Sequence, residues 1–185
     1  NVDFTGQDLT LNGAGNNSVG GTMEVSNAGT FTTADAAELT VNGNFTQNGS
    51  GNSVLGDDLT SSTGAIAFGT DVQLNSTDAI TIQTGEGDGD DLTITGNLSS
   101  AANESLTIDA GAAGDIDIDG TVQLNGGDLT ITDAAVVDFA QTVGVAGFTQ
   151  LDGTTSTTFN GLLTATGNVD FTGQDLTLNG AGNNS

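Results

Sequence analysis

The segment NVDFTGQDLTLNGAGNNS occurs twice in this chain, as Asn1–Ser18 and, letter for letter, as Asn168–Ser185. The sequence therefore has an internal period, and one full period is residues 1–167. Self-similarity at a fixed period is the signature of a repeat architecture. We expect residues 1–167 to form one unit of a tandem array. Residues 168–185 would then start the next, identical unit, in the same environment one repeat further along.

The repeated segment is built from short stretches in which apolar and polar residues alternate. Its first copy reads VDF, a turn at TGQD, LTL, and a second turn at NGAGNN. Alternation over three to five residues, bounded by Gly, Asn, Asp and Ser, is typical of short β-strands. The same pattern predicts strands around Val2/Phe4, Leu9/Leu11, Met23/Val25, Leu39/Val41, Ile66/Phe68, Val72/Leu74, Ile80/Ile82, Leu92/Ile94, Leu106/Ile108, Ile116/Ile118, Val122/Leu124, Leu129/Ile131, Val169/Phe171 and Leu176/Leu178.

Two kinds of position interrupt or end these strands. Val136–Phe139 and Phe159–Leu163 break the alternation, and we expect bends or bulges there. An asparagine follows several strands, and such a residue suits a tight turn because it tolerates left-handed backbone. Stacked asparagine ladders are the alternative for the same residues, which are Asn12, Asn42, Asn75, Asn125 and Asn179.

Strands this short need neighbours, since isolated short strands do not form a stable open sheet. Stacked in a solenoid, each strand pairs with the coils above and below at about 4.8 Å, and the inward side chains form one core. We therefore predict an all-β parallel β-helix, continuous across the tandem repeats, with about seven to nine coils per unit. A string of β-sandwich domains, two per repeat, is the alternative, and the absence of Pro and Tyr weighs against it.

Charge limits the partners of this chain. It has 24 acidic residues and no Lys, Arg or His, for a net charge of -24. Nothing in it can neutralise a phosphate, which excludes nucleic acid and an anionic membrane surface as partners. No apolar run reaches the roughly 18 residues of a membrane span, so we expect no membrane insertion in this segment.

Catalysis is also disfavoured by the composition. Without His, Cys, Lys, Arg or Tyr, only carboxylates and hydroxyls remain as reactive groups. A carboxylate pair can hydrolyse a glycosidic bond. To bind an acidic sugar, however, such an enzyme would need basic residues, and this chain has none. We therefore expect a protein that is not an enzyme.

Calcium is the one cofactor that these side chains suit, because it prefers hard oxygen ligands. Asp115, Asp117 and Asp119 match the opening D-x-D-x-D-G of a calcium loop, but Gly126 stands where the closing Glu belongs. The alternating Ile116 and Ile118 favour a strand with its three aspartates facing solvent.

A second acidic stretch, EGDGDD, resembles one turn of a calcium-binding β-roll, although it occurs only once. Its acidic residues are candidate metal ligands in a glycine-rich corner. They are Glu86, Asp88, Asp90 and Asp91.

The phrases DLTLNGAG, GNVDFTG, DLTITGNLSS and AELTVNGNFTQ resemble the repeat regions of giant bacterial surface proteins. These are the filamentous-haemagglutinin-like exoproteins and the passengers of autotransporters. The resemblance implies a right-handed parallel β-helix, secretion through the outer membrane, and a role in adhesion or surface structure.

These observations lead us to expect an acidic structural rod or stalk of an extracellular filament or surface adhesin. Its expected partners are copies of itself along the filament and cell-surface or matrix carbohydrate. The alternatives are a carbohydrate- or protein-binding adhesin module and a calcium-stabilised array of β-sandwich repeats. The absence of Trp and Tyr weighs against the binding module, because aromatic anchors dominate such contacts.

Overall fold

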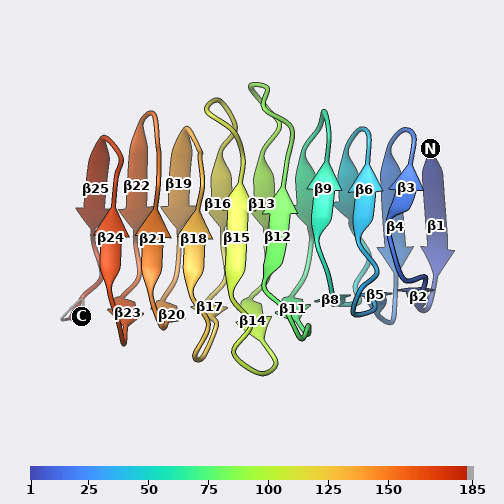
Figure 1. Cartoon of the computed structure of the whole chain (residues 1–185), viewed down its shortest axis with the longest axis horizontal. Helices are drawn as coiled ribbons and strands as arrows, with labels where there is room; N and C mark the ends of the chain where they lie inside the picture. Colours follow the sequence, from blue (N-terminus) through green and yellow to red (C-terminus); the bar gives the residue numbers. More distant parts are fainter. Residues whose placement is uncertain (183–185) are drawn as a thin grey trace.

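The computed structural model describes residues 1–182, and this part of the chain consists of short strands, turns and bends, with no helix. The chain winds into a solenoid in which each coil adds one strand to each of three parallel sheets (Figure 1). The predicted all-β parallel β-helix is thus confirmed. The β-sandwich alternative is wrong, because the strands of the described residues pair in parallel between successive coils.

The strands of each sheet follow one another along the solenoid axis. The first sheet contains β1 (Val2–Gly6), β4 (Met23–Asn27), β7 (Phe45–Gln47), β10 (Ile66–Phe68), β13 (Leu92–Ile94), β16 (Ile116–Ile118), β19 (Val136–Phe139), β22 (Ser156–Phe159) and β25 (Asp175–Leu178). The second contains β2 (Leu9–Leu11), β5 (Phe31–Thr33), β8 (Ser53–Leu55), β11 (Val72–Leu74), β14 (Leu98–Ser100), β17 (Val122–Gln123), β20 (Val143–Val145) and β23 (Leu163–Ala165). The third contains β3 (Asn17–Val19), β6 (Leu39–Val41), β9 (Leu59–Ser61), β12 (Ile80–Gln83), β15 (Leu106–Asp109), β18 (Leu129–Ile131), β21 (Phe148–Gln150) and β24 (Val169–Phe171).

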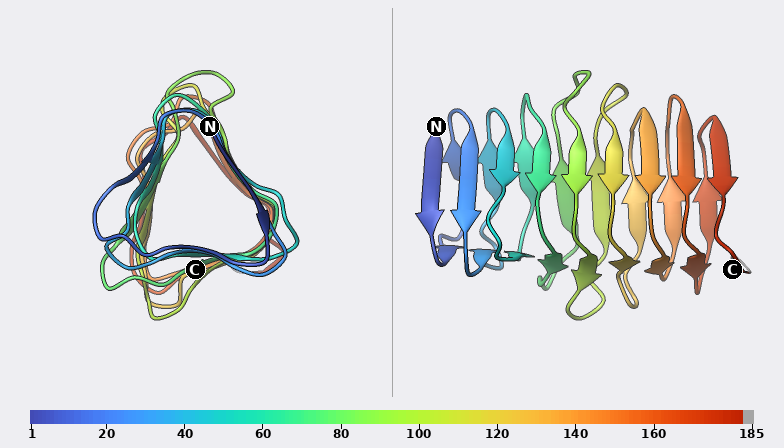
Figure 2. Two further views of the ribbon diagram at one scale, coloured as in Figure 1. Left: turned by 90° about the vertical axis from the view of Figure 1, so that its right-hand side faces the viewer. Right: turned by 180° about the vertical axis from the view of Figure 1, so that it is seen from behind.

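Viewed along the axis, the coils superpose as a triangle whose sides are the three sheets (Figure 2). The coils vary in length: along the first sheet, the shortest runs from Thr157 to its partner Leu176 and the longest from Ile66 to its partner Leu92. The extra residues lie at the corners. We number the corners in chain order: the first joins the first sheet to the second, and the second joins the second sheet to the third. At the third corner the chain passes from a third-sheet strand to the first-sheet strand of the next coil. This corner carries the longest connection, between Gln83 and Leu92.

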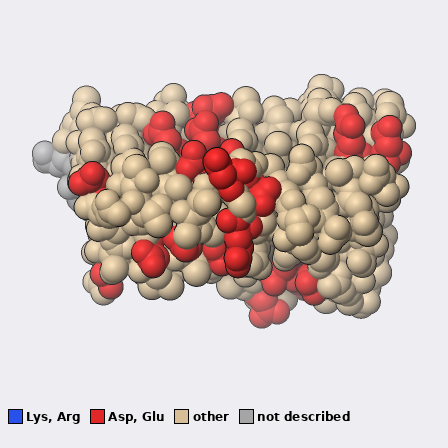
Figure 3. Space-filling view, turned by 90° about the horizontal axis from the view of Figure 1, so that it is seen from above, with Lys and Arg blue, Asp and Glu red and all other residues tan. Residues whose placement is uncertain are grey.

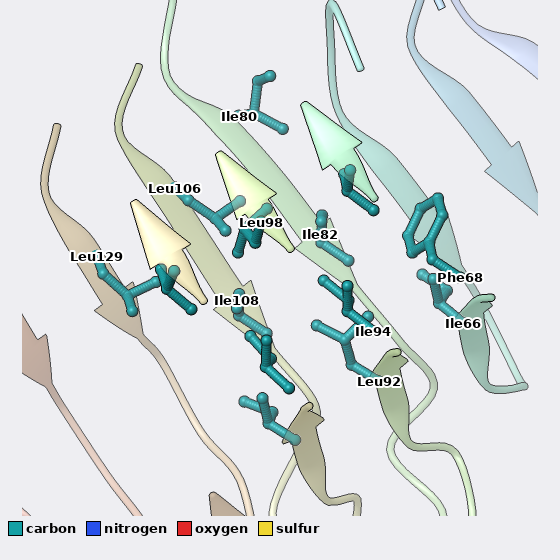
Figure 4. Packing of buried hydrophobic residues seen from close by; sticks show 14 of the residues in the cluster. Ile66, Phe68, Ile80, Ile82, Leu92, Ile94, Leu98, Leu106, Ile108 and Leu129 are labelled. Atoms are coloured by element: carbon teal, nitrogen blue, oxygen red, sulfur yellow. The ribbon is translucent and has the colours of Figure 1, made fainter. Parts of the chain in front are cut away.

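One apolar core runs along the inside of the solenoid, because alternate residues of each short strand point inward. In the middle of the molecule, side chains of Ile and Leu from all three sheets meet there (Figure 4). Phenylalanines fill the core nearer the ends, as in the stacked rings of Phe139 and Phe159, whose centroids are 4.8 Å apart. Each fully buried Leu, Ile or Phe contributes roughly 1.5–3 kcal/mol to stability.

The segments that break the alternation behave differently from one another. Val136–Phe139 forms a regular strand, β19, with Val137 and Phe139 buried, so the expected bend or bulge there is wrong. Phe159 ends β22 and Leu163 begins β23, so a bend does separate these two residues.

The five asparagines that follow strands do not form a ladder with one another, although Nδ2 of Asn179 donates to Oδ1 of Asn160, which follows the neighbouring strand β22, at 3.2 Å. Asn12, Asn75 and Asn125 follow second-sheet strands of coils that are not adjacent, whereas Asn42 follows the third sheet and Asn179 the first. Asn125 has a positive φ of 56°, which fits its place in a turn. The interpretation as a turn residue with left-handed backbone is therefore confirmed for Asn125.

The two copies of the repeated segment share one local contact but lie on different sheets, and their strand boundaries differ: β1 runs from Val2 to Gly6, whereas β24 ends at Phe171. In each copy the phenylalanine ring covers the turn: a Cβ on Gly6 would lie 2.8 Å from Cζ of Phe4, and one on Gly173 would lie 2.6 Å from Cζ of Phe171. Val2 belongs to the first sheet, however, and Val169 to the third. The expectation that the second copy has the environment of the first is thus wrong, because the two copies lie on different sheets. Residues 183–185 of this copy lie outside the described residues.

Candidate functional site: an acidic corner and two open ends

Acidic side chains gather along the third corner of the solenoid. Figure 3 looks onto this corner and shows Asp and Glu concentrated near its middle. The connections that follow β12 and β15 form this part of the surface (Figure 1). Every candidate metal ligand named from the sequence lies in one of these connections, in β16 or directly beside that strand.

Asp115, Asp117 and Asp119 lie on and beside strand β16 and are exposed. The buried Ile116 and Ile118 alternate with them, so the three carboxylates share the outer face of a strand. The solvent-facing strand is therefore confirmed in preference to a calcium loop. In such a strand the carboxylates point outward instead of converging on one ion.

Asp117 lies directly opposite Asp138 of the next coil. Asp138 accepts a hydrogen bond from Nδ2 of Asn160 at 2.6 Å. Burial raises the pKa of the Asp117 carboxyl above its usual value, and the charges of Asp119, Asp138 and Asp115 raise it further. The outer face of β16 thus carries an excess of negative charge. Residues 1–182 contain no Lys, Arg or His side chain that could neutralise it.

The EGDGDD stretch forms the long connection between β12 and β13, with Glu86 and Asp88 exposed. Asp90 closes the tip of this connection: its Oδ2 accepts the N–H of Gly87 at 3.0 Å. Gly89 has a φ of +86°, a conformation that favours glycine. Asp90 therefore serves to shape the connection.

Asp91 and Asp115 each hold the next coil in place. Oδ1 of Asp91 accepts the N–H of Asp115 at 2.9 Å, and Oδ1 of Asp115 accepts the N–H of Val136 at 3.0 Å. Each acceptor directly precedes the paired residues of a first-sheet strand, and each donor occupies the matching position of the next coil. We call this contact an inter-coil clip. In it, the side-chain oxygen of an Asp or Asn that directly precedes one strand accepts the backbone N–H at the matching position of the next coil.

Inter-coil clips recur on the first and second sheets. The same contact joins Asn1 to Thr22, Asp8 to Thr30, Asn44 to Ala65, Asp71 to Asn97, and Asn97 to Thr121, at 2.7 to 3.2 Å. On the third sheet the same contact joins Oδ1 of Asp58 to the N–H of Thr81, which occupies the matching position of the next coil, at 2.6 Å.

The clip oxygens satisfy corner N–H groups as the side chain of a helix N-cap does. Much of the Asp and Asn content thus has a structural use. Its sequence signal is an Asp or Asn immediately before the first apolar residue of a short strand. That signal is visible in the chain, but the pattern alone does not indicate a contact between coils.

Three further carboxylates interact in a cluster with Glu86 at the third corner although they are far apart in the sequence. Asp133 is one of them, and burial raises its pKa, as do the nearby charges of Asp152, Asp109 and Glu86. Its Oδ1 is a buried atom without a hydrogen-bond partner in the described residues. The sequence groups Glu86 with Asp88. Stacking of the coils instead brings Glu86 to residues of the following coils, which only the register reveals.

The acidic corner does not assemble a metal centre. Within residues 1–182, no group of three or more acidic side chains is arranged so that it could hold a metal ion. The corner can therefore attract cations through its collective charge, without a defined coordination shell.

A polar hollow lies at the second corner, between the connections that follow β11 and β14. Ser76, Thr77, Asp78, Asn103 and Glu104 are among its lining residues. Glu104 is 6% exposed; its Oε2 accepts the N–H of Ala102 at 2.7 Å, and its Oε1 has no partner in the described part of the chain. Its lining offers hydroxyl, amide and carboxylate groups and no aromatic side chain.

The two ends of the solenoid expose the edges of the core. At the first end, Val2, Phe4, Leu9, Leu11, Val19 and Met23 line an apolar hollow. At the other end, Val169, Leu176 and Leu178 are 45%, 39% and 44% exposed. No helix of the described residues is long and apolar enough to cross a membrane.

Comparison of the chain with protein-family models, with curated proteins and with solved structures finds no match. The function must therefore be inferred from the geometry.

Proposed function

We propose that this chain is a non-catalytic structural segment, an acidic rod or stalk that acts as a stiff spacer in an extracellular filament or surface adhesin. The observation that supports this most directly is the single core that runs from Met23 to Leu163. Because every inner coil pairs with both neighbours, bending the rod would stretch ladders of backbone hydrogen bonds on one side.

The charge of the chain supports the same proposal. A surface of one sign repels identical rods and limits edge-to-edge pairing between sheets. The same charges also repel one another within a single rod, and salt screens that repulsion. A saline extracellular setting, with calcium among the available counter-ions, therefore suits the protein. The exact return of Asn1–Ser18 as Asn168–Ser185 supports a filament in which copies of the unit follow one another.

Electron microscopy of chains that contain one, two and three copies of the unit, residues 1–167, tests the proposal. A rod requires the length to grow linearly, by about 37 Å per unit at about 4.8 Å per coil. The width should stay constant along the particle. A string of separate beads, or a length that does not increase with the number of units, would rule out a continuous stalk.

A further inference from the structure

The free edges at the end near Leu178 have counterparts elsewhere in the molecule, where their partners are seen. Strand β24 has the same sequence as Val2–Phe4, and Leu176–Leu178 has the same sequence as Leu9–Leu11. At the other end of the solenoid, Val2–Phe4 pairs with Met23–Val25, and Leu9–Leu11 pairs with Phe31–Thr33.

The first end therefore shows which strand fits each free edge. The N–H of Val2 donates to the carbonyl of Thr22 at 2.9 Å, and the N–H of Leu9 donates to the carbonyl of Thr30 at 3.0 Å. Val169 and Leu176 offer the same N–H groups and the same side chains. A second segment with the sequence of residues 22–33 would meet both edges in the registers that the structure already contains.

The sheet assignments fix the orientation of that segment. Val2 lies in the first sheet, whereas its equivalent one unit later, Val169, lies in the third. One unit therefore spans seven full coils and two further sides of the triangle. Leu9 and Leu176 show the same step, from the second sheet to the first.

We propose that β24 and β25 form the docking surface for residues 22–33 of a further copy of the unit, and that each unit is rotated by one side of the triangle relative to the one before. This inference rests on the proposed tandem rod. Three units would contain 23 whole coils, so the array regains its starting orientation only after about 110 Å.

The rotation has a consequence for how rods meet. The acidic third-corner connection after β12 would occupy each of the three edges of the rod in turn. A lateral contact made by one such connection would then recur along a given edge every third unit. Units of eight whole coils would instead align all of these connections in a single acidic row.

A distance measurement on an extended chain tests the proposal. We would extend the chain by one further copy of the unit and place a spin label at Asp88→Cys and at the equivalent aspartate of the second unit. The chain has no other cysteine, and Asp88 is exposed at the corner. The control is a chain built by repeating residues 2–175, which close eight whole coils because Val2 and Leu176 both lie in the first sheet.

In the control, the labels should be about 38 Å apart along the axis. In the natural repeat, the axial distance of about 37 Å combines with a lateral step of about 24 Å, one side of the triangle, to give at least about 44 Å. Equal distances in the two chains would overturn the rotation while leaving the rod intact. A broad, undefined distance in both chains would overturn the continuous rod and the docking surface with it.

Hydrogen exchange provides a second measurement that needs no label. The amides of Val169–Phe171 lie on a free edge in the present chain, and docking of the next unit should protect them by at least tenfold. The amides of Ile82 and Gln83, which are paired on both sides already, are the internal control. Unchanged exchange at Val169–Phe171 in the extended chain would refute the docking surface.

Discussion

Asp117 lies in the middle of strand β16 with carboxylates on both sides along its own strand and a further one opposite. Its raised pKa reflects partial burial first and the repulsion of these neighbours second. Two carboxylates about 4.8 Å apart repel by roughly 0.9 kcal/mol even at the dielectric constant of water. The folded state therefore holds the proton of this group more tightly than the unfolded chain does.

This linkage predicts the direction of the pH dependence. Between the ordinary pKa of 3.8 and the higher folded pKa, the folded state binds more protons, so its stability falls as the pH rises through that window. At neutral pH the ionised Asp117 remains destabilising. Asp117→Asn should thus raise the stability at pH 7 by a few tenths of a kcal/mol to about 1 kcal/mol, since the group is exposed and screened.

Urea denaturation at pH 7 and below pH 4 would measure this effect. The gain of Asp117→Asn should shrink at low pH, where the wild-type carboxyl is protonated as well. Asp88→Asn removes one charge from an exposed corner and is the matched control. A gain for Asp88→Asn equal to that for Asp117→Asn would mean that net charge, and not the stacking on β16, causes the change.

Among the elements of the fold, the inter-coil clips connect the corners of successive coils. Asp91 is informative because it was a candidate metal ligand and because its Oδ1 holds the N–H of Asp115. Removal of the acceptor by Asp91→Ala should cost about 0.5–1.5 kcal/mol. Asp91→Asn keeps an acceptor oxygen and should be close to neutral.

Thermal denaturation followed by circular dichroism can compare these variants with Asp88→Ala. For a chain of this length, 1 kcal/mol corresponds to about 2–4 °C in Tm. The order should be Asp91→Ala least stable, with Asp91→Asn and Asp88→Ala near wild type. If the loss in Asp91→Ala required calcium and disappeared with a chelator, Asp91 would be a metal ligand and the clip would not explain its role.

The sequence predicted most strands in which both inward residues are apolar, β19 and β20 being exceptions, and it missed those in which one of them is polar. Strand β7 reads FTQ, and its Gln47 points inward at the first corner. Its Nε2 donates to Oδ1 of Asn27 and to the carbonyl of Gly51, both at 2.7 Å. A buried amide with such partners is stable, but no local pattern shows that the partners will be there.

Residue 51 shows a second signal that depends on the fold. A Cβ on Gly51 would overlap the carbonyl oxygen of Gly29 in the preceding coil. The glycine allows the two backbones to approach at this corner. A sequence with so many glycines does not reveal which of them stand at such contacts, so corners and coil lengths could be predicted only as a range.

The candidate site was predictable in its composition but not in its grouping. Acidic residues at 86–91 and 115–119 do mark the charged third corner. The meeting of Asp133 with Asp152, Asp109 and Glu86 depends on how many residues each coil contains. The same uneven coil lengths determine the sheet on which the second copy of the repeated segment lies, and for this reason its rotation could not be predicted from the period alone.

At the scale of the whole molecule, 24 negative charges have no Lys, Arg or His to oppose them. Ions from solution must therefore supply the counter-charge. Sodium chloride should raise Tm, because the Debye length shrinks from about 30 Å at 0.01 M to about 10 Å at 0.1 M. Calcium chloride at matched ionic strength should add a smaller gain, since the carboxylates of residues 1–182 attract it without forming a coordination shell.

Melting curves in low salt, in sodium chloride and in calcium chloride separate the two contributions. Cations that bind only the folded state stabilise it by mass action, by about 2.7 kcal/mol at a hundredfold excess over Kd for one site. A calcium gain of that size, abolished by Asp133→Asn and retained in Asp88→Asn, would show a specific site at Asp133, Asp152, Asp109 and Glu86 and would contradict diffuse attraction. Independence of Tm from both salts would instead contradict the role given to the charge. In that case the repulsion between stacked coils would have no measurable effect on folding. Each added unit would then fold equally well in fresh and in saline water.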